Sequence, residues 1–269
     1  MWIGTTTDGA YRLQLDKNEL THPILKGNIT SIYQDSEGEL WIGSWEEGLH
    51  HVKTDGTIEI FEYDAKNPYS ISSNFVRACC EDNLGNIWIG TFNGLNRYDK
   101  STGLFQNHTA SDAQSDGLTH SSIWCIVKDN QGTLWLGTYF GGVNYFNPEY
   151  EIYTRYKVGD TEKEGLSSPI VGRMTEDKDG NLWICTEGGG VNVYNRKNNT
   201  YRWYRHEEGR NSISHNNVKA IYYDRTEEIM WIGTHLGGLN KLDLRTNAYR
   251  LPDESGRPDH TALGHCTRH

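Results

Sequence analysis

Three observations predict an all-β chain built from repeated four-stranded sheets. Tryptophan recurs at intervals of 39, 47, 47, 48 and 48 residues, at Trp2, Trp41, Trp88, Trp135, Trp183 and Trp231. Each repeat joins short apolar segments by turns rich in Gly, Asp and Asn, which is typical of β-strands. Aromatic residues reach 12% of the chain although hydrophobic residues make up only 35%, which suits thin sheets packed through rings. A repeat of about 47 residues with four strands predicts a β-propeller, with one blade per repeat.

A second column of residues stays in phase with the tryptophans. It holds Asp35, Asp82, Asp129, Asp177 and Asp224, six residues before the Trp in four repeats and seven residues before it in the last. The turns read "DSEGELW", "DNLGNIW", "DNQGTLW" and "DKDGNLW". Asp can cap such a turn and Gly can adopt a positive φ, so each turn predicts a hairpin between the first and second strands.

The segment after this turn, "LWIGT", alternates large and small residues. We expect the Trp to pack between neighbouring sheets and the Gly to let an adjacent blade approach. A Gly turn such as "TFNGLN" then leads into a third strand, and an aromatic run such as "YRWY" at 201–204 supplies the fourth. Cys185 replaces the repeat glycine and Cys79 lies before a turn, so both are expected to be small buried residues. The five cysteines show no disulfide framework and no zinc-ligand spacing.

The repeats place a propeller over residues 1–252, followed by a tail or closing strand over 253–269. The expected blades cover about 1–27, 28–73, 74–121, 122–168, 169–216 and 217–252, and the innermost strands cover 28–35, 74–82, 122–129, 169–177 and 217–224. The first blade lacks an innermost strand, because the chain opens at "MWIGT" in the middle of the repeat. Either "TALGHC" in the tail closes the ring, or the chain is a fragment of a seven-bladed propeller.

Charge and hydropathy exclude some classes of partner. The formal net charge is -10 and the isoelectric point is about 5.5, so long-range repulsion argues against nucleic acid and anionic membranes. The sequence contains neither an 18-residue apolar span nor a signal peptide. We therefore expect no direct membrane insertion by this segment.

Combined motifs identify a family resemblance. The stretches 67–105 and 209–243 join "NSIS" or a close variant, "DxxGxxWIGT" or a close variant, and "GLN". This combination resembles the two-component regulator propeller repeats in the extracytoplasmic sensor region of hybrid histidine kinases of Bacteroidetes. The resemblance covers residues 2 to about 251, which is nearly the whole chain.

The resemblance implies a periplasmic sensor whose seven-bladed propellers precede a β-sandwich and a membrane helix. Such sensors detect glycan breakdown products and control polysaccharide-utilisation genes. It implies an oligosaccharide or other small-molecule ligand, contact with the rest of the sensor chain, and a homodimer as an open alternative. This sequence departs from the family plan, because it has six Trp motifs and lacks the sandwich, membrane helix, kinase and receiver. No cofactor, metal or catalytic residue is predicted for it.

Positions that vary within an otherwise uniform repeat are the best candidates for a ligand site. Five residues before the Asp column stand Thr30, Arg77, Trp124, Gly172 and Lys219, and Arg173 follows Gly172. The loops between the second and third strands carry Trp45, Glu46, Phe92, Asn93, Tyr139, Phe140, Glu187 and His235. Aromatic planes, amides and charges suit a saccharide.

Two of these positions carry cations. Arg77 and Lys219 favour a carboxylated or sulfated sugar. The alternatives are that they are solvated or pair with Glu46 and Glu187, and that Trp124 fills space as packing.

Catalysis has little support in the sequence. HExxH, GxSxG and phosphate-binding Gly loops are absent, and the Asp turn resembles the sialidase Asp-box only as a structural turn. We expect His50, His51, His206 and His215 to be exposed. A glycosidase using Glu46 and Glu187, or a lyase using a loop histidine such as His235, stays open, as does a protein-interaction scaffold.

Overall fold

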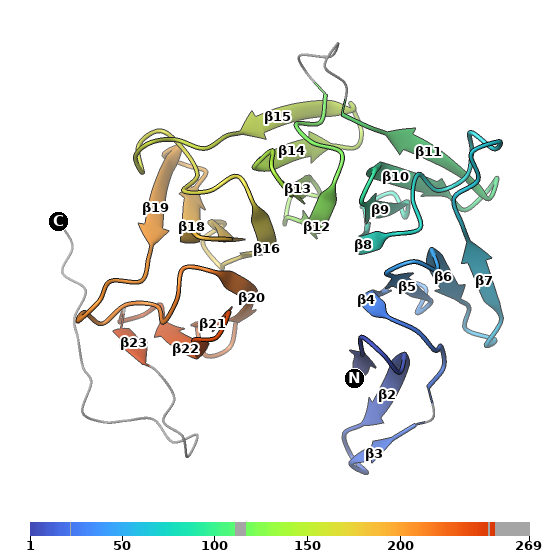
Figure 1. Cartoon of the computed structure of the whole chain (residues 1–269), viewed down its shortest axis with the longest axis horizontal. Coiled ribbons are helices and arrows are strands. Elements are labelled where there is room, and N and C mark those ends of the chain that lie inside the picture. Colours follow the sequence, from blue (N-terminus) through green and yellow to red (C-terminus); the bar gives the residue numbers. More distant parts are fainter. Residues whose placement is uncertain (22, 111–116, 247, 251–269) are drawn as a thin grey trace. The chain divides into compact units, whose positions relative to one another are not determined.

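The computed structural model describes residues 1–21, 23–110, 117–246 and 248–250 (Figure 1). These residues form strands β1 to β23 and contain no helix. The strands make six antiparallel sheets, and in every sheet the strands are adjacent in chain order. Each repeat is therefore a meander, and the predicted all-β propeller architecture of six blades is confirmed.

The first sheet has three strands and each of the others has four. The first contains β1 (Trp2–Gly4), β2 (Ala10–Gln14) and β3 (Glu19–Leu20). The second contains β4 (Ile29–Gln34), β5 (Leu40–Ser44), β6 (Leu49–Val52) and β7 (Ile58–Phe61). The third contains β8 (Val76–Glu81), β9 (Ile87–Thr91), β10 (Gly94–Asp99) and β11 (Leu104–His108). The fourth contains β12 (Ile123–Lys128), β13 (Leu134–Thr138), β14 (Val143–Asn147) and β15 (Ile152–Tyr156). The fifth contains β16 (Val171–Glu176), β17 (Leu182–Thr186), β18 (Gly190–Asn195) and β19 (Thr200–Tyr204). The sixth contains β20 (Val218–Asp224), β21 (Ile229–Thr234), β22 (Gly238–Asp243) and β23 (Ala248–Arg250).

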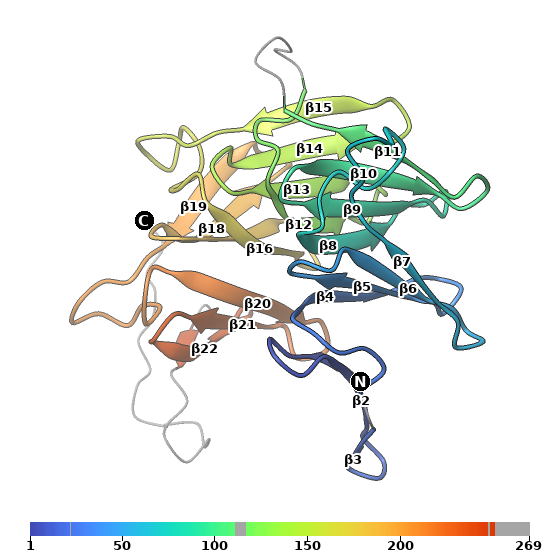
Figure 2. The same cartoon turned by 45° about the vertical axis from the view of Figure 1, so that its right-hand side comes forward.

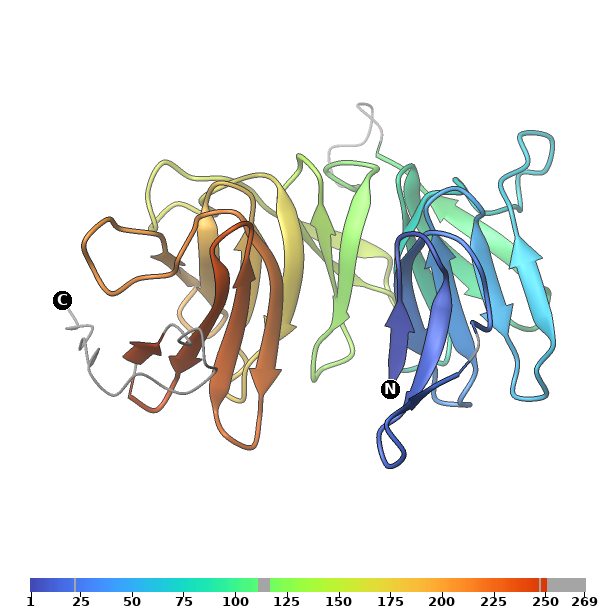
Figure 3. The same ribbon diagram turned by 60° about the horizontal axis from the view of Figure 1, so that its bottom comes forward.

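The described chain forms two compact units. The first comprises residues 1–136 and 144–154, and the second comprises residues 137–143 and the described residues from 155 onward. In the first unit β1 lies beside β4, β4 beside β8 and β8 beside β12 (Figures 1 and 3). In the second unit β16 lies beside β20 (Figure 2). The closing strand expected within 253–269 lies outside the described residues.

A buried hydrogen bond joins the Asp and Trp columns. In the third repeat Asp82 Oδ1 accepts the backbone N–H groups of Leu84 and Asn86 at 2.8 and 2.9 Å, while Oδ2 accepts the Trp88 indole N–H at 2.8 Å. The equivalent indole bond is 2.9 Å long in three other repeats, at Asp35 and Trp41, Asp129 and Trp135, and Asp177 and Trp183. One carboxylate therefore shapes the turn and also satisfies the only polar atom of the buried indole ring.

The last repeat departs from this pattern. Asp224 Oδ1 accepts the N–H groups of Thr226 and Glu227 at 3.0 and 3.1 Å, but no described bond joins Asp224 to Trp231. The turn is one residue longer, with Glu228 at a φ of 55°. Trp231 is half-buried and lies 5.4 Å from the Lys241 ammonium, measured to the ring centroid. The additional residue thus uncouples the turn from the ring.

The tryptophans pack between neighbouring sheets. Trp41 and Trp88 are fully buried, and Trp88 meets Phe146 of the next repeat edge-on with ring centroids 5.0 Å apart. In the second and third repeats the glycine two residues after the Trp permits this approach. A Cβ atom on Gly43 would lie 2.7 Å from Val76 Cγ1, and one on Gly90 would lie 2.7 Å from Ile123 Cγ2. The predicted core role of the Trp column agrees with this packing.

Polar side chains also connect successive turns. The Ser36 hydroxyl donates to Glu81 Oε1 at 2.7 Å and the Ser36 N–H donates to Glu81 Oε2 at 2.8 Å. The Lys100 ammonium lies 3.2 Å from Asp35 Oδ2 and 2.8 Å from Glu37 Oε2. The turn of the second repeat is therefore held by two residues of the third.

The buried cysteines agree with their expected role. Cys185 is fully buried at the glycine position of the fifth repeat. Cys79 is buried as a free thiol, and desolvation raises its pKa to about 12, so it is unreactive at neutral pH.

The prediction that the histidines are exposed is wrong for His50 and His51. Both lie in β6, where 2% and 4% of their surface is accessible. His50 stands where the other four-stranded repeats carry an asparagine, at Asn96, Asn144, Asn192 and Asn240. The amide oxygens of these asparagines accept backbone N–H groups of the loop before the innermost strand, at Ser72, Thr119, Ser167 and Ser214. Desolvation lowers the pKa of His50, against the opposing charges of Glu47 and Glu62.

Replacing Trp88 by Phe should reduce the free energy of unfolding by about 2–4 kcal/mol, because it deprives the Asp82 carboxylate of a donor and leaves a cavity. Urea denaturation would measure the loss. The matched control is Trp231→Phe, which breaks no described indole bond and should cost about 1 kcal/mol or less. Equal losses in the two variants would contradict a special role for the Asp–Trp bond.

His50 should make the fold acid-sensitive. Because its folded pKa lies below the ordinary value of 6.5, the unfolded chain takes up a proton first, and the free energy of unfolding falls as the pH drops through about 6.5. Replacement of His50 by Asn should make this fall shallower in denaturation series between pH 5 and 8. The His50→Asn change should not abolish the fall in the free energy of unfolding, because burial also lowers the pKa of His108. The exposed His206→Asn control should keep the original slope, and an unchanged slope in His50→Asn would refute the assignment.

Candidate functional site

The innermost strands share an irregularity near their start. Their pairing with the second strand shifts register between Ile29 and Ser31, Val76 and Ala78, Val171 and Met174, and Val218 and Ala220. The bulged positions are Thr30, Arg77, Gly172 with Arg173, and Lys219. A bulge leaves a residue outside the ladder and redirects its side chain. The column that varies within the repeat is therefore the column of bulged residues, and Trp124 holds the same position in β12.

Backbone hydrogen bonds hold the loops between the second and third strands beside these bulges. The first residue after the second strand donates its backbone N–H to the carbonyl two residues before the bulge. Four repeats show this bond, from Trp45 to Asn28, Phe92 to Phe75, Glu187 to Ile170 and His235 to Asn217, at 2.8–3.0 Å. The two sets of candidate residues thus lie side by side within each of these blades.

In the first unit, three predicted residues from three successive repeats form one stack. The Arg77 guanidinium carbon lies 4.4 Å from the Trp45 ring centroid and 4.7 Å from the Trp124 ring centroid. Two indole faces stabilise a guanidinium through their quadrupoles. The planar edge of such a group carries N–H donors with the geometry that carboxylates and sulfates require. We call these three residues the Arg77 stack.

Aromatic rings extend the stack. Phe75, which the sequence analysis did not select, lies 5.5 Å from Trp45 and 6.0 Å from Phe92 between ring centroids. Trp45 and Phe92 remain 38% and 53% exposed, and Glu46 and Asn93 beside them are also exposed. Phe75 could have been found, because its column, two residues before the bulge, varies as the bulge column does.

The second unit holds the other predicted residues in a different arrangement. The Lys219 ammonium is paired with the Glu187 carboxylate, which is one of the two alternatives left open by the sequence. Arg173 is exposed, and Tyr139 and Phe140 meet edge-on at 4.5 Å. His235 lies 6.5 Å from His215 between ring centroids. The Glu187 carboxylate therefore already supplies a counterion to Lys219.

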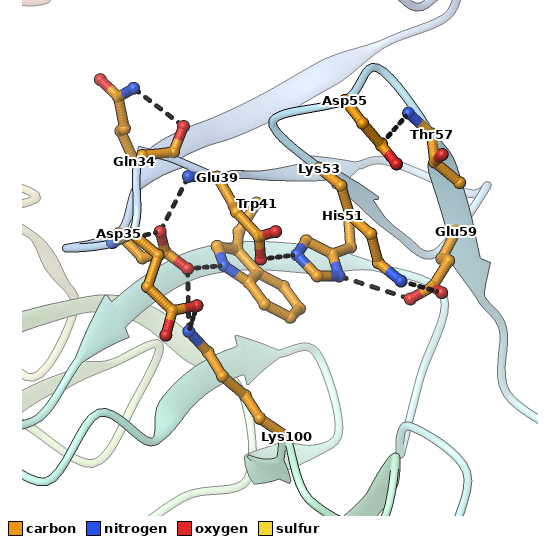
Figure 4. Close-up of polar contacts among 12 residues, drawn as sticks. Gln34, Asp35, Glu39, Trp41, His51, Lys53, Asp55, Thr57, Glu59 and Lys100 are labelled. Carbon is orange, nitrogen blue, oxygen red and sulfur yellow. Dashed lines mark hydrogen bonds and ion pairs between the residues drawn. The ribbon is translucent and has the colours of Figure 1, made fainter.

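Three carboxylates lie close together near Trp41 (Figure 4). Oxygens of Asp35, Glu37 and Glu39 lie within 4.8 Å of one another. Lys100 already supplies a cation to Asp35 and Glu37, while Glu39 Oε2 bonds His51 Nε2 at 2.6 Å. Burial would raise the pKa of Asp35, but the bonds from Trp41 and Lys100 outweigh it and hold the pKa below its ordinary value. The group is a structural ion-pair network.

Comparison with known proteins finds a match to one repeat model in four segments of the chain. A model of the two-component regulator propeller matches residues 23–46, 70–93, 117–140 and 165–188. Each match runs from the loop before an innermost strand through the Asp turn and Trp strand. No curated protein matches.

Solved structures share the fold at low sequence identity. The extracellular domain of a hybrid two-component system from B. thetaiotaomicron is 20% identical with a TM-score of 0.54, over 89% of this chain and 38% of that one. A virginiamycin B lyase from Staphylococcus aureus is 16% identical with a TM-score of 0.64, over 89% and 75%. An auxiliary nutrient binding protein from Bacteroides ovatus is 12% identical with a TM-score of 0.61, over 89% and 65%.

This chain therefore spans well under half of the two-component system domain that it matches. Its described residues contain no helix long and apolar enough to cross a membrane. Its fold is shared with a domain from a hybrid two-component system. Four of its blades carry segments that match the two-component regulator propeller repeat.

Proposed function

We propose that this chain is a ligand-sensing part of a periplasmic, hybrid two-component sensor, and that the Arg77 stack binds an oligosaccharide or other glycan breakdown product. The observation that carries the proposal is the guanidinium held between the Trp45 and Trp124 rings. In this role the segment binds without turnover and acts through the rest of the sensor chain, alone or as a homodimer, on polysaccharide-utilisation genes.

The chemistry of the stack suits an acidic sugar. The exposed rings of Trp45 and Phe92 offer apolar planes to the C–H faces of a pyranose. Glu46 and Asn93, both exposed in the same loops, supply an acceptor and an amide for hydroxyl groups. The two indoles fix the Arg77 side chain before a ligand arrives, so less conformational entropy is lost on binding.

Two of the related structures support a sensor, and a third supports an enzyme as the second candidate. One is an extracellular domain of a hybrid two-component system and another is a nutrient binding protein. A lyase is the second candidate, because a virginiamycin B lyase shares the fold and because His235 lies near His215. A protein-interaction scaffold would need neither the Arg77 stack nor the two histidines.

A panel of neutral, uronic and sulfated oligosaccharides tests the proposal. We expect one acidic class to raise the midpoint of thermal unfolding by mass action and to bind saturably in calorimetry. The Arg77→Gln change should weaken binding at least tenfold, Arg77→Lys should weaken it less, and Trp124→Ala should also weaken it, since charge and stacking both contribute. The matched control, Lys219→Gln, removes a cation already paired with Glu187 and should retain the affinity.

Chromatography of the same mixtures distinguishes the alternatives. A new product that disappears in His235→Ala would establish the lyase. The absence of binding by every glycan, from a chain that unfolds cooperatively, would overturn the sensor proposal and favour the scaffold.

A further inference from the structure

A cavity of about 450 Å³ lies on the outer half of the third blade, away from the bulges. It is lined by β10, β11, the turn between them and the loop at Pro68 and Tyr69. None of its lining residues belongs to the Arg77 stack or to the loops beside it. Its volume falls within the range of about 300–1,000 Å³ that is usual for small-molecule sites.

The sheet register and one loop build this cavity. Arg97 pairs with Gln106 and Asp99 pairs with Leu104 across β10 and β11, so the four side chains share one face of the hairpin. The loop runs along the free edge of β11, where the Phe105 N–H donates to the Tyr69 carbonyl at 3.0 Å. The Asn107 amide also donates to the Ser70 carbonyl at 3.0 Å. These bonds anchor Tyr69, whose surface is 57% exposed, beside the cavity.

Arg97 brings an unmatched charge to the cavity. It is half-buried, and its Nε atom is completely buried without a hydrogen-bond partner. Within the described residues, no carboxylate forms an ion pair with it. Burying a guanidinium without a counterion costs free energy, and an anionic ligand would remove that cost. A bidentate carboxylate is the group that a guanidinium fork binds best.

Asp99 adds a carboxylate to the cavity lining. Its Oδ1 accepts the Ser101 hydroxyl at 2.6 Å and the Ser101 N–H at 2.8 Å, and these bonds hold the pKa of Asp99 below its ordinary value. Asp99 therefore stays ionised at neutral pH, and within the described residues it forms no ion pair with Arg97. Thr102 also hydrogen-bonds its carboxylate, whose two oxygens together have about four acceptor positions, so Asp99 can also accept a hydroxyl proton.

We infer that this cavity, which we call the rim site, binds an acidic monosaccharide unit through its carboxylate at Arg97. Its ring C–H face packs on Tyr69, and a hydroxyl donates to Asp99. The rim site is separate from the Arg77 stack, so either site can exist without the other.

Nuclear magnetic resonance of the ¹⁵N-labelled full chain with glucuronate, glucose and acetate tests the rim site. We expect glucuronate to shift the backbone signals of Ser101, Thr102 and Gln106 saturably. Glucose, which lacks the carboxylate, and acetate, which lacks the ring, should bind at least tenfold more weakly. The Arg97→Gln change should weaken glucuronate binding at least tenfold, and Tyr69→Ala should weaken it several-fold.

Matched variants separate the two sites and control for folding. Arg77→Gln should keep the shifts that glucuronate causes near Ser101, as should Arg210→Gln in an exposed loop. Arg97→Gln should not lower the thermal midpoint, because Arg97 makes no described hydrogen bond and its partly buried charge has no described counterion. Arg97→Lys keeps the charge without the fork and should bind with intermediate affinity. Equal binding of glucose and glucuronate, or full affinity in Arg97→Gln, would overturn the inference. No binding near Ser101 with intact binding at the Arg77 stack would refute the rim site alone.

Discussion

A buried bond between a carboxylate and an indole N–H is the interaction on which the rest of this fold depends. In four repeats it ties the turn between the first two strands to the ring that packs against the next sheet. Without the carboxylate the indole would bury an unsatisfied donor, and without the indole the turn would lose its link to the core. In the second and third repeats the glycine two residues after the Trp, Gly43 or Gly90, leaves room for the neighbouring blade. The fifth repeat has Cys185 at this position.

Because the Asp and Trp positions hold the blades together, amino-acid variation between repeats is confined to positions outside this set. The bulged residue of each innermost strand is one such position, since it is released from the ladder. Its side chain can be threonine, arginine or lysine without altering the sheet. The fold thus supports a chemically diverse set of side chains on a uniform backbone, and binding specificity can change there at little cost in stability.

The sequence predicted the sheets well because the signals that define them are local. Turn chemistry, alternation and the Trp interval act within a few residues. Variation within the aligned repeats selected the column of residues that the structure shows to be bulged, but it did not predict the bulges. Contacts between repeats could not be predicted from the sequence. Nothing near Arg77 indicates that Trp45 lies on its guanidinium, and nothing near Lys219 shows which of the two suggested environments it adopts. His50 and His51 were misjudged because their stretch looked like a loop, whereas strand pairing buries them. The Arg97 cavity depends on a loop that docks from 28 residues earlier in the chain, at Tyr69.

The connections between turns bear on how such a chain can evolve. The turn of the second repeat depends on Glu81 and Lys100, which belong to the third. A segment of one repeat length, copied or exchanged by recombination, would carry its own Asp and Trp but leave these partners behind. The segment that carries all the contacts of this turn is therefore longer than one repeat.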